Sequence, residues 1–381
     1  MIGRAVVTGL GLVTPLGDTP EEVWRRVLDG ETAALAHADL AEEGFPITTA
    51  CRVPGDLGEA DPTRRGRALA ARAVGAALAE AGLDADGAGL FLGSTMGESA
   101  AYEAAAEGAP TDLATVAADI ITRDVAALVG LDGPRRTYST ACAAGNYAIG
   151  AAARAVEAGA AQAIVAGGVE PFSRIAMLGF ARMRAMTPDL CRPFDAGRRG
   201  MQLGEAAAFL VVEPEQMART RGAAVLARVG PLGLTGDAHH PTAPLADGSG
   251  MAAAMRVALA RAKLSSAEVG WVNAHGTGTL QSDAAEAKAV EIVFGEYRPP
   301  VSSLKGAFGH SLGAATAVEA AMSVLALGGR VIPPTANHET ADLELHVDVV
   351  DAPRAAPGLR WVLNCGYAFG GLDSALLLGV P

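Results

Sequence analysis

The chain has 381 residues, 50% of them hydrophobic and 19% charged, and its formal net charge is −12. This length and composition predict a globular protein whose core is large enough for two domains or one double-layered α/β unit. The excess of acidic side chains excludes the broad basic surface that a nucleic-acid-binding protein needs.

Strands and helices are predicted to alternate along the first part of the chain. It begins with MIGRAVVTGLGLVTPLG, which lacks the charged segment and cleavage site of a signal peptide, so we interpret it as a strand entering a turn. Short apolar runs predict strands at residues 5–8, 89–92, 136–138, 163–166 and 207–212. Longer stretches between them predict helices at residues 20–29, 67–81, 116–128 and 144–158.

The second part repeats this order of elements. Its predicted strands are residues 224–229, 271–274, 300–303, 361–364 and 374–378, and its predicted helices are residues 248–262, 283–294 and 312–327. Such alternation is typical of α/β layers, and the repeated order predicts an internal duplication that meets near residues 214–222. The last of these helices is apolar, but Glu319 interrupts it and it is too short to span a bilayer, so we expect it to be buried.

The four cysteines, at positions 51, 142, 191 and 365, include no CxxC pair and no zinc-like spacing. So few cysteines in so long a chain do not form a disulfide framework. We therefore expect reduced thiols in the cytosol, and core packing is the ordinary role expected of Cys51, Cys191 and Cys365.

Cys142 differs from the others in its setting, the sequence YSTACAAGN at residues 138–146. A short strand runs into small residues and then into an Ala-rich helix, which places the thiol at a helix N-terminus. The helix dipole and the free N–H groups there would lower the thiol pKa and help to bind an oxyanion. Cys142 is therefore the candidate nucleophile, and a small cysteine packed in the core is the alternative.

A second motif, VNAHGTGT at residues 272–279, contains His275, Thr277 and Thr279. A strand ends there in a Gly/Thr-rich loop, and a helix follows near Asp283. The carboxyl end of a strand is where α/β proteins bind ligands, and two hydroxyls suit an amide-bearing arm. A structural histidine in an ordinary strand-to-helix turn is the alternative.

A third motif, SSLKGAFGHSLGAA at residues 302–315, contains Lys305 and His310. The histidine precedes a helix whose dipole would lower its pKa and favour the neutral imidazole. The chain has only three lysines among its 30 basic residues, which suggests that Lys305 does something an arginine cannot. Its carboxylate partner would come from the preceding helix, as Glu286 or Asp283. A solvated surface charge is the alternative.

A fourth motif, NCGYAFGG at residues 364–371, is a Gly-rich turn between two predicted strands. Such a turn can present a backbone N–H group to an oxyanion. An ordinary hairpin turn is the alternative.

Together, the four motifs resemble those of the elongating β-ketoacyl-acyl-carrier-protein synthases, which include the ketosynthases of polyketide pathways. The resemblance runs nearly from end to end, through VVTGLGLVTPLG, STACAAG, IVAGGVEP, RPFDAGRRGMQLGEAAAFLVVEP, NAHGTGT, KGAFGHSLGAA, VIPPT and AFGG. It implies a thiolase fold of the α/β class, in which duplicated βαβαβαββ halves form a layered αβαβα architecture. Residues 1–217 would carry the nucleophile, and residues 218–381 would carry the two catalytic histidines.

The resemblance also implies a decarboxylative Claisen condensation of an acyl thioester with a malonyl-type carrier-protein thioester. Cys142 matches the family nucleophile, and His275 and His310 match the pair that binds the malonyl carbonyl and drives decarboxylation. Lys305 matches a lysine that orders the site, with Glu286 as its expected partner. The remaining matches are the oxyanion-hole N–H groups of Cys142 and Phe369 and the phosphopantetheine contacts of Thr277 and Thr279.

Three features depart from the family pattern. The gating position, usually Phe-Gly, is Tyr367-Ala368, and alanine is less free to swing than glycine. The usual Thr-Asn after the glycines is Leu372-Asp373. The chain is also short in two stretches that shape the family's cap and dimer surface, residues 55–67 and 98–115.

The implied enzyme is a cytoplasmic acyltransferase that binds neither a metal nor a cofactor of its own. Its substrates are carried on the phosphopantetheine of an acyl carrier protein, and it forms a homodimer or a ketosynthase heterodimer, with no nucleic-acid or membrane partner. Because carrier proteins are acidic, Arg64, Arg65 and Arg67 are expected to form the docking patch. A solvated helix start is the alternative.

Other functions fit parts of this pattern. The same site could transfer an acyl group to an amine or alcohol, or only decarboxylate a malonyl unit. A non-catalytic chain-length partner of a ketosynthase typically lacks the cysteine, so Cys142 argues against that role. Cys365 suggests a CoA-dependent thiolase, but it precedes the Gly-rich turn at the wrong spacing, and HGTGT with Lys305 fits a synthase better.

Overall fold

The computed structural model describes residues 4–112 and 117–381, and an eleven-stranded sheet runs through it. The first half of the chain contributes β1 (Ala5–Val13), β4 (Gly89–Gly93), β5 (Arg135–Tyr138), β6 (Ile164–Glu170) and β7 (Ala206–Pro214). The second half contributes β8 (Ala227–Gly236), β9 (Val269–Asn273), β10 (Pro300–Ser302), β12 (Asp348–Val349), β14 (Trp361–Ala368) and β15 (Leu372–Gly379).

The two halves of the sheet have the same strand order. The first runs β5-β4-β6-β7-β1 and the second β10-β9-β14-β15-β8, with β12 added at its edge. In each, the first three strands are parallel and the last two pair antiparallel. The halves join where β1 pairs with β8. This equivalence agrees with the predicted duplication, while the division into 1–217 and 218–381 stays a prediction.

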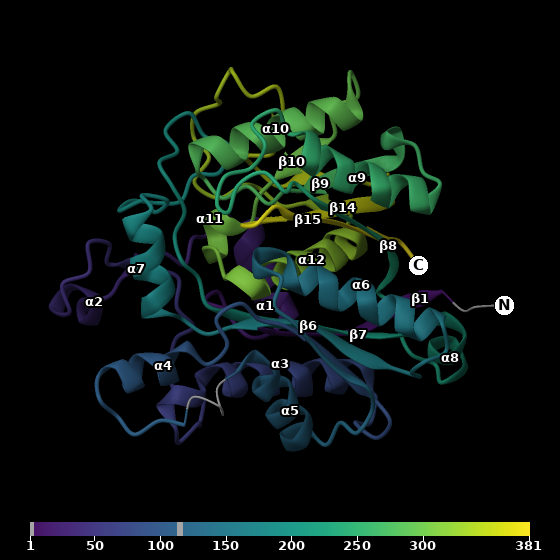
Figure 1. The fold of residues 1–381 in the computed structure, drawn as a ribbon. Coiled ribbons are helices and arrows are strands. Elements are labelled where there is room, and N and C mark those ends of the chain that lie inside the picture. The colour runs from purple at the N-terminus through teal and green to yellow at the C-terminus, as the bar shows by residue number, and fades with distance from the viewer. Residues whose placement is uncertain (1–3, 113–116) are drawn as a thin grey trace.

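Helices form three layers around the two halves of the sheet (Figure 1). The central layer, between the halves, consists of α6 (Ala144–Glu157) and α12 (Leu312–Gly329). The outer faces are covered by α3 (Arg65–Ala81) with α5 (Ala118–Val129), and by α9 (Ser249–Ala262) with α10 (Leu280–Phe294). The sequence of layers is therefore αβαβα.

The remaining elements are short and lie around these layers. The helices are α1 (Pro20–Leu28), α2 (Ala38–Glu42), α4 (Ser99–Ala106), α7 (Arg174–Arg182), α8 (Glu215–Thr220) and α11 (Lys305–Phe308). The strands are β2 (Leu35–Ala36), β3 (Thr49–Ala50), β11 (Val331–Ile332) and β13 (Arg354–Ala355). Of these, only α1 was predicted, and Val116 of the predicted helix at 116–128 lies outside the described residues.

Strand β7 shows why both faces of the sheet are covered. Alternate side chains along it point to opposite faces, and every residue from Ala206 to Val212 is fully buried. Ala208 and Leu210 pack toward α6 and α12, whereas Phe209 packs toward α3. A strand buried on both faces needs an unbroken apolar sequence, which AAAFLVV supplies.

Small residues let the two central helices approach closely. A Cβ atom added to Gly145 of α6 would lie 2.6 Å from the backbone nitrogen of Ala317 in α12, so only glycine fits. Among the described helices, α12 alone has the length and hydropathy to cross a membrane, and 83% of it is buried inside the protein. It is therefore a core helix of the kind found in soluble proteins, as predicted.

Candidate active site

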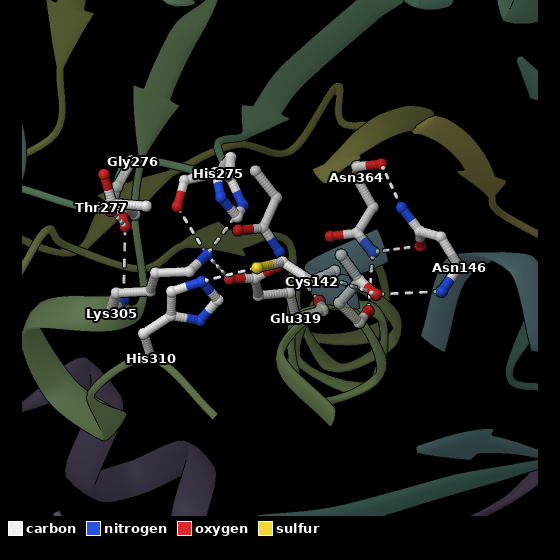
Figure 2. Close-up of polar contacts among 12 residues, drawn as sticks. Cys142, Asn146, His275, Gly276, Thr277, Lys305, His310, Glu319 and Asn364 are labelled. Atoms are coloured by element: carbon white, nitrogen blue, oxygen red, sulfur yellow. Dashed lines mark hydrogen bonds and ion pairs between the residues drawn. The ribbon is translucent and has the colours of Figure 1, made fainter. Parts of the chain in front are cut away.

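Most of the site residues predicted from the sequence line a cavity of about 570 Å³. Cys142, His275 and His310 border it, and a sulfur or nitrogen atom of each lies within 4.8 Å of the other two (Figure 2). The fold thus brings together three residues that are far apart in the sequence, from both halves of the chain. The cavity wall also includes Thr277, Thr279, Tyr367, Ala368 and Phe369.

Cys142 lies in a short 3-10 turn, Ala141–Ala143, that leads directly into α6. The residue before it, Ala141, has a φ of 47°, a left-handed conformation that is unfavourable for residues other than glycine and recurs at functional sites. The cysteine is 8% exposed, and its sulfur lies 3.1 Å from Nε2 of His310. The turn therefore aims the sulfur at an imidazole.

Burial raises the pKa of the Cys142 thiol to about 12, and the charge of Lys305 opposes this effect only in part. The sequence predicted the opposite direction from the helix N-terminus. That prediction is wrong because it weighed the helix dipole without the loss of hydration that a buried thiolate suffers. The thiol is therefore neutral in the free protein and needs a base to take its proton, and His310 is in position to do so.

His275 and His310 lie edge to face, with their ring centroids 5.3 Å apart. Burial lowers the pKa of both rings well below the usual value, and the charge of Lys305 lowers it further. Both rings are neutral at pH 7, as predicted, although burial rather than a helix dipole is the main cause. A neutral imidazole has one accepting and one donating nitrogen, which suits a thiol base and a donor to an enolate oxygen.

Lys305 is 1% exposed, and its Nζ forms a 2.5 Å ion pair with Oε1 of Glu319 on α12. Nζ also donates to the carbonyl of His275 at 2.5 Å and lies 3.3 Å from Nδ1 of that ring. Because an ammonium group only donates, Nδ1 accepts and the ring proton is on Nε2. The expected pairing with Glu286 is wrong, since Lys305 pairs with the one acid that interrupts the apolar helix.

Glu286 instead holds the loop that carries His275. From α10, its carboxylate accepts the backbone N–H of His275 at 2.8 Å and that of Gly276 at 2.7 Å. Asp283, one turn earlier, accepts the N–H of Gly278 at 3.1 Å. These bonds fix the loop at the end of β9, and the hydroxyls of its two threonines lie 2.9 Å apart.

Breaking the Lys305–Glu319 pair should destabilise the protein, and removing both charges should restore most of the stability. Lys305→Met leaves the Glu319 carboxylate buried without a cation, which costs about 3–5 kcal/mol in the free energy of unfolding. The cost should grow as the pH rises, because a lone buried Glu319 escapes it by binding a proton. Denaturant unfolding at pH 6 and pH 9 measures both effects.

The matched control is the double variant Lys305→Met/Glu319→Gln, which leaves no charge in the pair. It should recover most of the lost stability. A single variant that unfolds at the wild-type denaturant concentration at both pH values would contradict the role given to the pair.

The Gly-rich turn between β14 and β15 forms one side of the cavity. Its two glycines have φ values of 84° and 71°, which other residues rarely adopt. The ring of Phe369 packs against Phe180 of α7 with centroids 5.7 Å apart, and the ring of Tyr367 lies edge-on to His275. These contacts place the turn beside the catalytic candidates, and its roles as gate and oxyanion hole stay predictions.

All three arginines expected to dock a carrier protein lie within ion-pair distance of carboxylates of this chain. Nε of Arg65 lies 2.5 Å from Oε1 of Glu205, whose side chain is fully buried, and Arg67 pairs with an acid of the preceding loop at 2.6 Å. Arg64 lies 3.9 Å from Asp61. Docking at these residues stays a prediction, and Arg65 has a structural role as well.

Sequence reasoning missed the polar residues that tie the central helices to the sheet at the site. Nδ2 of Asn364 on β14 donates to Oδ1 of Asn146 on α6 at 2.9 Å, and the N–H of Asn146 donates to Oγ1 of Thr316 on α12 (Figure 2). Glu170 of β6 accepts the N–H of Gly313 in the first turn of α12. The two asparagines are the last residue of the first motif and the first residue of the fourth, and this position beside the candidate catalytic residues could have indicated their role.

Comparisons with known proteins agree with this geometry. The model of the β-ketoacyl synthase N-terminal domain matches residues 54–218, and that of the C-terminal domain matches residues 226–339. The 3-oxoacyl-[acyl-carrier-protein] synthase 2 of Rhizobium meliloti is 36% identical over 98% of both chains. The putative polyketide β-ketoacyl synthase 1 of Streptomyces halstedii is 36% identical over 100% of this chain and 99% of its own.

The chain belongs to the β-ketoacyl synthase family. A β-ketoacyl synthase from Burkholderia phymatum superimposes on it with a TM-score of 0.91, at 33% identity and with full coverage of both chains. The ishigamide ketosynthase/chain length factor does so with a TM-score of 0.93, at 34% identity and with the same coverage. These likenesses establish the thiolase-type α/β fold that the sequence implied.

Membership of the β-ketoacyl synthase family also establishes the class of reaction. The chain is an acyltransferase that catalyses a decarboxylative Claisen condensation. The comparisons give no support to acyl transfer onto amines or alcohols, or to decarboxylation alone. Cys365, which suggested a thiolase, is fully buried in β14 and is absent from the cavity wall.

Proposed function

We propose that Cys142, His275 and His310 perform this condensation on acyl groups carried by an acyl carrier protein. The observation that carries the proposal is the 3.1 Å contact between the Cys142 sulfur and Nε2 of His310. This contact lies in a cavity that both imidazoles border. A nucleophile, its base and a second imidazole N–H therefore surround one space in which a thioester carbonyl fits.

The first step transfers the acyl group to the enzyme. His310 takes the thiol proton, and the sulfur attacks the carbonyl carbon of the acyl thioester. The backbone N–H groups of Cys142 and Phe369 are the proposed donors to the oxyanion that forms. When the intermediate collapses, the carrier thiolate leaves and takes the proton back from His310, so the imidazole is neutral again.

The second step forms the new carbon–carbon bond. The carbonyl oxygen of a malonyl-type thioester accepts hydrogen bonds from His275 and His310. The bond to its carboxylate breaks, CO₂ leaves, and the electron pair stays as an enolate that these donors stabilise. The enolate carbon attacks the acyl group on Cys142, the carbon–sulfur bond breaks, and the thiolate takes up a proton from water. Loss of CO₂ drives the sequence forward.

The partner of the reaction is an acyl carrier protein, as the names of several relatives state for those proteins. Thr277 and Thr279 on the cavity wall are the proposed contacts of the phosphopantetheine arm. We place the enzyme in the cytoplasm, as a homodimer or as a heterodimer with a second ketosynthase-like chain. Residues 1–217 then supply the nucleophile, and residues 218–381 supply the two histidines.

Mass spectrometry tests this function directly. With an acyl carrier protein alone, intact-protein spectra should show the acyl mass added to the enzyme. Adding malonyl carrier protein should release CO₂ and give the β-ketoacyl carrier, longer by two carbons. The variant Cys365→Ala, which removes a buried thiol outside the cavity wall, is the matched control and should behave like the wild type. Release of CO₂ without a longer product, or transfer to an added amine, would contradict the proposal.

A further inference from the structure

Two acidic residues meet where two segments of the cavity wall join. Asp237 follows the end of β8, and Asp373 is the second residue of β15, two residues beyond Gly371 of the Gly-rich turn. The segments are bound together by backbone hydrogen bonds, from Asp237 N–H to Gly371 O at 3.0 Å and from Gly370 N–H to Pro241 O at 2.8 Å. Both aspartates border the cavity.

The two carboxyl groups lie against the same glycine. A Cβ atom added to Gly250 of α9 would be 1.5 Å from Oδ1 of Asp237 and 3.1 Å from Oδ2 of Asp373. Both of these oxygens are buried, and neither has a hydrogen-bond partner among the described residues. The other oxygen of Asp237, Oδ2, accepts the N–H of Leu245 at 3.2 Å.

Burying Oδ1 of Asp237 and Oδ2 of Asp373 without hydrogen-bond donors is unfavourable if both carboxyls are ionised. Each would lose its hydration without a compensating hydrogen bond, and the two negative charges would repel each other. A single proton removes both costs, because a protonated carboxyl donates to its neighbour. The resemblance noted in the sequence places an asparagine, which also donates, at the position of Asp373.

We propose that Asp237 and Asp373 share one proton, and that this acid pair holds the Gly-rich turn, which includes Phe369, in position against the segment after β8. The functional part of this proposal rests on the proposed function, in which the N–H of Phe369 binds the oxyanion. Loss of the proton replaces a hydrogen bond by a like-charge pair. The turn then loses one of its attachments beside the cavity, and acyl transfer to Cys142 slows.

The surroundings of Asp373 favour the protonated form. Burial, followed in importance by the neighbouring Asp237 carboxylate, raises its pKa to about 8. The side chains that interact electrostatically with Asp373 are acids or neutral groups, with no cation among them in the described part of the chain: Asp237 after β8, Glu286 on α10, Tyr147 on α6, and Cys365 and Tyr367 on β14. Tyr367 also stands directly opposite Asp373 in the β14–β15 pair.

The pH profile of acyl-enzyme formation tests the proposal with the variant Asp373→Asn. The amide donates the same hydrogen bond but cannot lose its proton in this pH range. The variant should therefore stay active and lack the decline above pH 8. At pH 9, only about one tenth of a group with this pKa is protonated, so the variant should acylate about tenfold faster than the wild type, relative to their rates at pH 7.

Asp247→Asn is the matched control, because it changes an acid of the same segment whose carboxyl accepts the N–H of Ser249 beside α9. Its profile should be that of the wild type. An unchanged alkaline decline in Asp373→Asn, or inactivity of this variant at every pH, would overturn the proposal, because the amide preserves the hydrogen bond.

Infrared spectroscopy of protein labelled with [¹³C]aspartate tests the shared proton without reference to activity. A protonated aspartate band should be present at pH 7, fall to about one tenth of its intensity by pH 9, and be missing in Asp373→Asn. If the wild type shows no such band at pH 7, the acid pair is refuted even when the enzyme is an active ketosynthase. A band present in an inactive enzyme would instead refute the proposed function alone.

Discussion

Replacing Cys142 by alanine should abolish acyl-enzyme formation and lower condensation by on the order of 10⁴-fold or more, because no other described thiol borders the cavity. Intact-protein mass spectrometry after incubation with an acyl carrier should show the unmodified mass. The variant should still release CO₂ from malonyl carrier protein, because His275 and His310 remain in place and decarboxylation does not use the sulfur.

The control for this experiment is Cys191→Ala, another fully buried cysteine outside the cavity wall. Its acylation should match the wild type. An acyl adduct on the Cys142→Ala variant, located by peptide mapping at a different cysteine or at a serine, would remove Cys142 from the role of nucleophile.

Replacing His310 by alanine should impair both steps of the reaction. Decarboxylation should fall by about 10²–10⁴-fold, because one of the two donors to the enolate oxygen is lost. Acylation should also slow, because burial raises the pKa of the Cys142 thiol to about 12 and His310 is the base beside it. Stopped-flow or quenched assays of CO₂ release and of acyl-enzyme formation separate the two effects.

The pH dependence of acylation distinguishes the loss of the base in His310→Ala from a general loss of structure. The wild-type imidazole stays neutral above pH 7, because its pKa is lowered well below the usual value, so proton removal from the thiol does not depend on added hydroxide. In His310→Ala, hydroxide must remove the proton, so acylation should rise about tenfold per pH unit up to pH 8, where loss of the proton shared by Asp237 and Asp373 begins to oppose the rise.

His346→Ala is a suitable control, because His346 is exposed and is not part of the cavity wall. It should leave both rates unchanged. Decarboxylation at the wild-type rate in His310→Ala would show that this imidazole is not a donor to the enolate.

Local patterns in the sequence predicted the main strands and helices well, because strands that are buried on both faces require unbroken apolar runs. They were less accurate at the ends of elements. The strand β1 extends to Val13 rather than ending at residue 8, and Gly9 and Gly11 within it lie flat against the backbone of α3. Only the packed helix shows that these glycines provide close approach instead of a bend.

At the site, three short motifs were enough to propose Cys142, His275, Lys305 and His310, because each motif follows a strand and leads into a loop or helix. The partner of Lys305 could not be found in this way. Glu286 and Glu319 are both acids on helices. Only the packing of α12 against Lys305 shows that Glu319 is the one that pairs with its ammonium group.

By itself, the sequence determined the α/β architecture, the family and the residues that meet in the cavity, because these depend on hydrophobic periodicity and on motifs read along the chain. Only the tertiary structure decided how those residues ionise and what they contact. The raised thiol pKa of Cys142 and the facing carboxyls of Asp237 and Asp373 both arise from groups brought together and stripped of water by distant segments. Hydration and distance are properties of the packed molecule, so no local pattern records them.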